Sequence, residues 1–414
     1  MNINKLKNGI TMITDEVPSA NTACIGFFVK AGSVDEDATN YGISHIIEHM
    51  MFKGTPTRSA QQISEEFDAL GISINAFTGE EYTCYYAKTL PENLIKAAEI
   101  YSDMLMNSEY DETELSKELM VIIEEYKMYR NNPEYHAANL FSNNFFKGTN
   151  FEVDIIGTED SIKNTTREKI VKYISEHYCN ENIVVCVSGK FDKEEITSYI
   201  ENHFNMGNAT ITRELELNFA EPARVSHIKE DTEQSYVIMA THIFGKNDPR
   251  RHALMILSKM MGGSMSSRLF KTIREEQGLA YSVGSYTDFM AETGTFMITA
   301  GVSNDKVEQT VQSICNEIRK LREHGFSEEE FLKAKNIMKS GVVFYYEGIH
   351  NRMVEVGASK LLNDMDVEIS NLTSVIDAVT YDDVVNVAEY INNCDNYSCL
   401  VYSNKEHDVD MLMR

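Results

Sequence analysis

The chain has 414 residues, a length that favours two domains, and its 43% hydrophobic and 25% charged residues are typical of a folded globular protein. The 38 Lys and Arg stand against 64 Asp and Glu, so the formal charge of −26 disfavours nucleic acid and anionic membrane partners, and it suits either basic ligands or solubility alone. Because there is no signal-peptide core, no membrane-spanning apolar run and no CxxC among seven cysteines, we expect a cytoplasmic protein with reduced thiols.

Period-2 and period-3.6 patterns predict alternating strands and helices through the first half of the chain. Strands are expected at residues 9–16 and 22–32, and a helix through 41–55. A second helix should begin with Ser59 as N-cap and end at Gly71. Further elements are expected in the order strand, strand, helix, helix and strand, at residues 72–79, 82–90, 92–107, 111–132 and 182–192.

The order of elements restarts after a weakly periodic, turn-rich stretch. Residues 70–78, "LGISINAFT", align with 279–287, "LAYSVGSYT", at an offset of 209 residues, and the same offset places 53–55 over 262–264. We infer a diverged duplication with an α+β fold, in which each domain is a mostly antiparallel sheet flanked by helices. The domains are predicted at 1–208 and 223–414, with a linker at 209–222.

The segment "YGISHIIEHMMFKGT" carries the first candidate site. On a helix His45 and His49 project from one face and Glu48 lies beside them, which suits two metal ligands and a carboxylate that activates water. The alternative is an ordinary pair of core or solvated histidines. In the second copy Leu254, Leu257 and Ser258 occupy the equivalent positions, so that copy cannot repeat the chemistry.

A zinc site needs a third protein ligand, and the predicted helix at 111–132 offers several carboxylates. Acidic residues on a helix usually form a solvated surface, and spacing alone does not show which one points inward. The choice therefore stays open among Glu114, Glu118, Glu124 and Glu125.

The "HIIEH" motif, followed by "VIIEEYKMY", resembles the inverted zinc signature of the pitrilysin, insulin-degrading enzyme and mitochondrial processing peptidase family. Segments such as "NAFTGEEYTCYYAKTLPENL" and "REEQGLAY" also resemble the family, in the family's order and over nearly the whole chain. The resemblance implies a zinc endopeptidase with one Zn²⁺ per chain, held by His45, His49 and Glu125. Glu48 would be the general base, and Glu118 would lie beside the ligands.

The resemblance extends to residues outside the motif. It implies that Arg274 and Tyr281 stabilise the substrate and the oxyanion, whereas without the resemblance an ordinary helix-terminal Arg and a Tyr packed on the sheet are the preferred interpretation. It also implies that Asn75, Ala76 and Phe77 lie on an edge strand that pairs with an extended peptide, whereas a core role for Phe77 is the alternative.

The resemblance further implies that the chain is one half of a clamshell. It also implies a peptide substrate, with basic peptides preferred. A homodimer is expected, in which each site takes zinc ligands from one protomer and Arg274 and Tyr281 from the other. Three alternatives remain: a non-catalytic structural or binding subunit, a metal hydrolase of small non-peptide substrates, and a hetero-oligomer with an inactive homologue.

Overall fold

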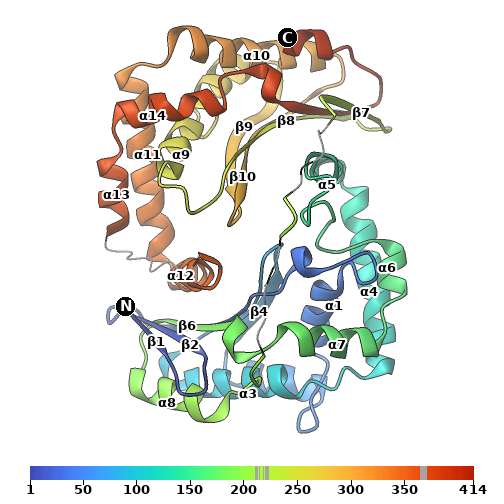
Figure 1. Cartoon of the computed structure of the whole chain (residues 1–414), viewed down its shortest axis with the longest axis vertical. Helices are drawn as coiled ribbons and strands as arrows, with labels where there is room; N and C mark the ends of the chain where they lie inside the picture. Colours follow the sequence, from blue (N-terminus) through green and yellow to red (C-terminus); the bar gives the residue numbers. More distant parts are fainter. Residues whose placement is uncertain (210–212, 214, 218, 220–222, 364–370) are drawn as a thin grey trace. The chain divides into compact units, whose positions relative to one another are not determined.

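The computed structural model describes the chain apart from residues 210–212, 214, 218, 220–222 and 364–370. The chain forms two compact units, each a sheet with helices against it (Figure 1). The first unit comprises Met1–Met128, Gly148–Asn218 and Tyr345–Ile369, and the second comprises Tyr129–Lys147, Phe219–Phe344 and Ser370–Arg414. The predicted α+β class with two similar domains is confirmed. Within the described ranges, every helix is too short or too polar to cross a membrane.

The sheet of the first unit is antiparallel except between β2 and β6, which run parallel. Its inner strands β3 and β6 are buried along their whole length, which explains their nearly continuous apolar sequences. The strand β4 forms one edge and pairs only with β5 among the described residues. In sheet order the strands are β1 (Asn2–Lys5), β2 (Thr11–Glu16), β6 (Ile183–Gly189), β3 (Ala23–Val29), β5 (Thr83–Thr89) and β4 (Ser73–Thr78).

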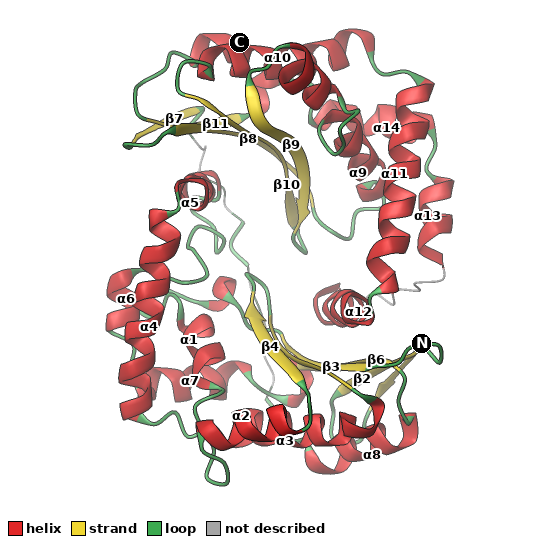
Figure 2. Ribbon diagram, turned by 180° about the vertical axis from the view of Figure 1, so that it is seen from behind, coloured by secondary structure: helices red, strands yellow, loops and turns green. Residues whose placement is uncertain are grey.

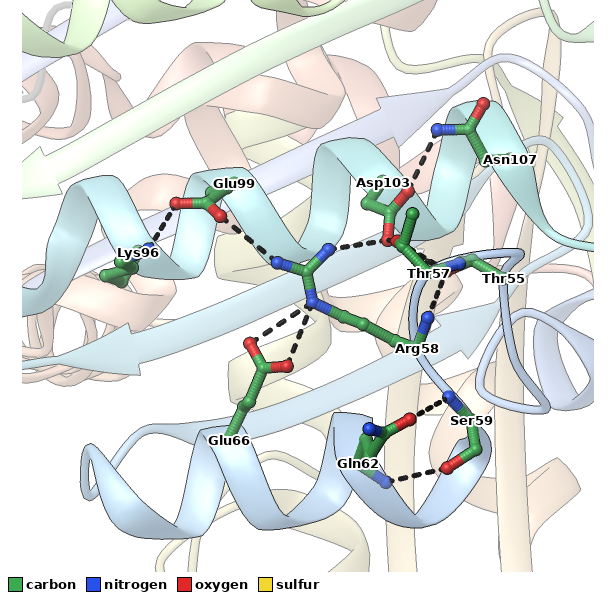
Figure 3. Close-up of polar contacts among 10 residues, drawn as sticks. All are labelled: Thr55, Thr57, Arg58, Ser59, Gln62, Glu66, Lys96, Glu99, Asp103 and Asn107. Atoms are coloured by element: carbon green, nitrogen blue, oxygen red, sulfur yellow. Dashed lines mark hydrogen bonds and ion pairs between the residues drawn. The ribbon is translucent and has the colours of Figure 1, made fainter.

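The helices of the first unit begin and end largely where local signals predict. Ser59 caps α2 by accepting a hydrogen bond from the Gln62 backbone N–H, and its own backbone N–H donates one to Oε1 of the Gln62 side chain (Figure 3). Gly71, at φ +62°, follows the end of that helix. The helices are α1 (Ile43–Met50), α2 (Ala60–Ala69), α3 (Leu94–Asn107), α4 (Glu112–Asn131), α6 (Glu159–Lys163), α7 (Arg167–His177), α8 (Lys193–His203) and α12 (Ile349–Asn363).

The sheet of the second unit repeats the first. Its strand order β7-β11-β8-β10-β9 matches β2-β6-β3-β5-β4, and β7 and β11 form the equivalent parallel pair. The offset of 209 residues places β4 within β9 and α1 within α9, as the duplication predicts. The strands are β7 (Val225–Lys229), β8 (Gln234–Phe244), β9 (Ala280–Phe289), β10 (Thr293–Ser303) and β11 (Ser398–Ser403). The helices are α5 (Pro133–Phe145), α9 (Arg251–Met261), the π-helix η4 (Phe270–Glu276), α10 (Val307–His324), α11 (Glu328–Glu347), α13 (Leu372–Ala378) and α14 (Tyr381–Val387).

The compact units do not follow the predicted domains 1–208 and 223–414, because one helix from each half of the chain belongs to the unit formed mainly by the other half. Helix α12 packs on β3 and β6 of the first unit, and α5 packs on β8 and β11 of the second (Figure 2). Arg352 of α12 donates two hydrogen bonds, of 2.7 and 2.9 Å, to the buried Asp15 of β2. The compact units are therefore not contiguous in sequence, and part of the predicted linker at 209–222 lies outside the described residues.

Candidate metal centre

The helix α1, which carries the "HIIEH" motif, is fixed at its N-terminus by a buried carboxylate. Glu36 accepts hydrogen bonds from the backbone N–H groups of Gly42, at 2.6 Å, and Ser44, at 2.8 Å. Gly42 takes the left-handed conformation at φ +85°, which favours glycine. Burial raises the pKa of Glu36 to about 8, although the N–H donors of Ser44 and Gly42 favour its ionised form. These contacts set the entry of α1 immediately before His45.

The three predicted metal ligands meet in the first unit. His45, His49 and Glu125 each offer a ligand atom within 4.8 Å of the others. The Oε2 atom of Glu125 lies 3.9 Å from His45 Nε2 and 3.5 Å from His49 Nε2. Glu124, by contrast, is 73% exposed and pairs with Lys127. Of these two carboxylates on α4, Glu125 is therefore the one that faces both histidines, and its role as a metal ligand stays a prediction.

The electrostatics of these histidines fit a bound cation. Burial, together with the neighbouring His49, lowers the pKa of His45 to about 3, so His45 is the neutral imidazole that a metal requires. Its Nδ1 atom is buried and has no hydrogen-bond partner in the described part of the chain. Burial opposes protonation of His49, yet Glu118 and Glu125 raise its pKa. A cation between these groups would replace the proton that the carboxylates attract, so the donor set fits a zinc ion.

Glu118 lies behind His49, as expected. Its Oε1 atom is 2.9 Å from His49 Nδ1, which leaves Nε2 facing Glu125. Its other oxygen forms an ion pair with Lys53, a residue that the sequence reasoning missed. Although burial raises the pKa of Glu118, the hydrogen bonds from His49 and Lys53 bring it below its usual value. Glu118 is thus an ionised acceptor that fixes the His49 ring.

Glu48 lies beside the ligands and contacts the edge of the sheet. Thr78 of β4 donates a 2.6 Å hydrogen bond from its hydroxyl to Glu48 Oε2. Burial raises the pKa of Glu48, which makes its carboxylate a better proton acceptor. Thr78 was also missed from the sequence, because its role depends on β4 packing beside α1.

The three predicted substrate-binding residues all lie on the edge strand β4. Asn75 is exposed and Ala76 is buried. The half-buried ring of Phe77 packs against Tyr82 and Tyr86, with centroid distances of 5.6 and 6.3 Å. An open strand edge beside Glu48 is compatible with peptide pairing, which stays a prediction.

Arg274 and Tyr281 lie together in the second unit. The guanidinium carbon of Arg274 is 5.7 Å from the centre of the Tyr281 ring, and Tyr281 is 77% exposed. Tyr281 is therefore not a packed core residue, and the catalytic role of the pair stays a prediction. On α9, Leu254, Leu257 and Ser258 are buried where the first unit has its motif.

Comparisons with protein families match both halves of the chain. Residues 11–159 match insulinase, peptidase family M16, and residues 164–338 match the peptidase M16 inactive domain. The chain is 34% identical to an uncharacterised zinc protease of Rickettsia felis, over 97% of this chain and 98% of that protein. It is 31% identical to the uncharacterised zinc protease YmxG of Bacillus subtilis, over 93% and 94%.

Solved structures share the fold. A protease from Helicobacter pylori matches with a TM-score of 0.88 and 23% identity, over 97% of this chain and 99% of that one. A peptidase M16 inactive domain from Pseudomonas fluorescens matches with a TM-score of 0.88 and 17% identity, over 98% and 99%. At these identities the likeness supports the fold alone.

Proposed function

This chain belongs to peptidase family M16, and we propose that it is a zinc-dependent endopeptidase whose metal is held by His45, His49 and Glu125. The observation that carries the proposal is the convergence of these three ligand atoms within 4.8 Å, next to the half-buried carboxylate of Glu48. One ion per chain is expected, because α9 of the second unit has no equivalent ligands.

A zinc ion at this position would supply Lewis acidity, polarising a carbonyl and lowering the pKa of a water molecule to about 7. The chain's own residues would do the rest. Glu48, held by Thr78, would accept the proton of the attacking water and return it to the leaving amine. Tyr281 and Arg274 would donate hydrogen bonds to the oxyanion and the substrate.

The substrate that this site suits is an extended peptide or an unfolded segment. Main-chain hydrogen bonds from the edge of β4, at Asn75, Ala76 and Phe77, would hold it without a strict sequence requirement. The net charge of −26 favours a basic peptide, and it is explained equally well by solubility.

Cleavage of a quenched basic peptide by wild type and by Glu48→Gln tests the reaction. We expect the variant to lose activity by about 10²- to 10⁴-fold, as is usual when a general base is removed. Glu65→Gln, which alters an exposed carboxylate on α2, should match wild type. Glu48→Gln with wild-type activity would refute the role of Glu48.

A non-catalytic subunit is the second candidate, and the match of residues 164–338 to the inactive domain leaves it open. A wild-type chain that holds zinc but cleaves no peptide in a broad panel would support this candidate, or a hetero-oligomer in which a partner completes the enzyme. If the chain cleaves small esters or amides but no peptides, the result would instead favour a metal hydrolase of non-peptide substrates.

We also infer a homodimer in which each site combines the zinc ligands of one protomer with Arg274 and Tyr281 of the other. The inference depends on one chain carrying both sets of residues. A cytoplasmic location accords with seven free, buried cysteines.

A further inference from the structure

We propose that Lys53 is a positioning residue of the metal centre, which acts through Glu118 on the ring of His49. The inference rests on the proposed zinc site. Glu118 lies between two donors: His49 Nδ1 at 2.9 Å from one oxygen, and Lys53 Nζ in an ion pair with the other. The Glu118 side chain is only 9% exposed, so both of its oxygens depend on these partners.

Lys53 lies in the loop between α1 and α2, and this loop is bound tightly to α3. Asp103 of α3 accepts hydrogen bonds at its Oδ2 atom from the hydroxyls of Thr55 and Thr57, each at 2.9 Å (Figure 3). The guanidinium of Arg58 donates to the same Asp103 oxygen at 2.6 Å. The short stretch after Lys53 therefore has three side chains bonded to one carboxylate.

Arg58 connects this loop to two helices at once. Besides Asp103 it donates to Glu99 of α3, at 3.1 Å, and to Glu66 of α2, with both distances 3.1 Å (Figure 3). The Arg58 side chain is 16% exposed, so this is a partly buried charge network rather than a surface ion pair. We call the set Thr55, Thr57, Arg58 and Asp103 the loop clasp.

The backbone of the loop is fixed in the same way. Thr55 and Arg58 exchange backbone hydrogen bonds, and Gly54, at φ +122°, forms a bridge with Ser59. The Glu109 N–H also donates to the Gly54 carbonyl at 3.2 Å. Because the loop clasp and these bonds hold the residues after Lys53, its ammonium reaches Glu118 from a fixed backbone.

The consequence for the metal centre follows from the low exposure of Glu118. With Lys53 present, both carboxylate oxygens are engaged and the His49 ring is held with Nε2 toward Glu125. Without the ammonium, a buried oxygen loses its partner and the carboxylate can rotate, so the His49 ring is less restrained. Outer contacts of this kind typically change metal affinity by about 10- to 100-fold.

The test is the dissociation constant for Zn²⁺, measured by competition with a chelating dye, on the full-length chain. We expect Lys53→Met to bind Zn²⁺ about tenfold more weakly than wild type, and Lys53→Arg, which keeps a cation, to recover most of the affinity. The matched control is Lys117→Met, which removes an exposed lysine paired with Glu114 on α4, and its affinity should be unchanged.

A double-mutant cycle with Glu118→Gln separates positioning from a general structural role. If Lys53 acts through Glu118, Lys53→Met should cause no further loss of Zn²⁺ affinity in the Glu118→Gln chain. Lys53→Gln, which is one atom shorter and polar but uncharged, serves if the methionine variant unfolds, and circular dichroism checks each fold.

The outcomes distinguish this inference from the proposed function. If wild type binds Zn²⁺, and Lys53→Met and Lys53→Gln bind it with an affinity within twofold of wild type, the role of Lys53 is overturned and the zinc site is not. Equal losses from Lys53→Met with and without Glu118→Gln would overturn the route through Glu118. Wild type that binds no Zn²⁺ would overturn the zinc site itself, and this inference with it.

Discussion

His242 illustrates at the scale of a single residue how burial sets a pH response. It lies on β8 with its ring stacked on Phe145 at a centroid distance of 4.0 Å and 4.4 Å from the Phe219 ring. Both ring nitrogens are buried and lack hydrogen-bond partners among the described residues. Burial lowers the pKa of His242 from 6.5 to about 4.

The native state therefore binds a proton at His242 less readily than the unfolded chain does. The contribution of His242 to the free energy of unfolding is complete above pH 6.5 and is lost as the pH falls toward about 4. We expect His242→Phe to reduce the loss of stability over this window by roughly 2 kcal/mol, since partial exposure screens the full effect. Urea unfolding at several pH values measures it, with His203→Phe on α8 as an exposed control.

A pH dependence of unfolding that is the same in wild type and His242→Phe would contradict this account. The difference between the two proteins is the relevant quantity, because many carboxylates titrate in the same range.

The residues of the candidate site divide by how far their role depends on the local sequence. The placement of His45, Glu48 and His49 side by side follows from helical spacing alone. The choice of Glu125 depended on the family resemblance, because sequence spacing leaves Glu124 equally possible. Only the packing of α4 turns Glu124 to solvent and Glu125 toward the histidines. The contacts of Thr78 and Lys53 were not predicted, because the partner of each, Glu48 and Glu118, lies 30 or more residues away in the chain.

At the scale of elements, α12 shows how close an approach the fold requires. A Cβ atom at Gly357 of α12 would lie 2.4 Å from the Phe28 ring of β3. Phe28 is fully buried, so the ring has little room to move. Gly357 thus lets the helix lie directly on the sheet of the first unit.

We expect Gly357→Ala to lower the free energy of unfolding by about 1–3 kcal/mol through overpacking. Gly341→Ala is the matched control, because Gly341 lies in the exposed part of α11 with nothing within 4 Å of a Cβ atom. It should raise stability by about 0.5–1 kcal/mol, as alanine is the better helix former. Denaturant midpoints measure both changes, and a Gly357→Ala protein as stable as wild type would refute the close packing.

Most strands and helices could be predicted from the sequence, but the sheet on which each helix packs could not. The strands at β2 to β6 and the helix α2, with its Ser59 cap, follow from alternation, periodicity and capping signals. The amphipathic patterns of α5 and α12 indicate only that one face of each helix is buried. Nothing local in them indicates that each packs on the sheet of the other half of the chain.

At the scale of the whole molecule, the duplication gives one chain with one motif and two versions of the same sheet. The matching strand orders confirm the repeat that the 209-residue offset indicated. The resemblance predicts an arrangement of two chains in the complete enzyme.

Mixing two inactive variants tests the shared-site homodimer. Glu48→Gln and Tyr281→Phe chains, each nearly inactive alone, should regain part of the wild-type activity when they exchange subunits, because one of the two sites then has both intact residues. A mixture of two Glu48→Gln preparations is the control. If subunits exchange and no activity returns, each chain builds its own site.

The zinc content of the purified chain, measured for wild type, Glu125→Gln and Glu124→Gln, tests the central claim most directly. Glu125 faces both histidines, whereas Glu124, the next residue, faces solvent. We predict about one zinc per chain in wild type and in Glu124→Gln, because a site of two His and one Glu binds zinc, and far less in Glu125→Gln. Wild type without zinc, or Glu125→Gln with as much zinc as wild type, would contradict the proposed metal centre.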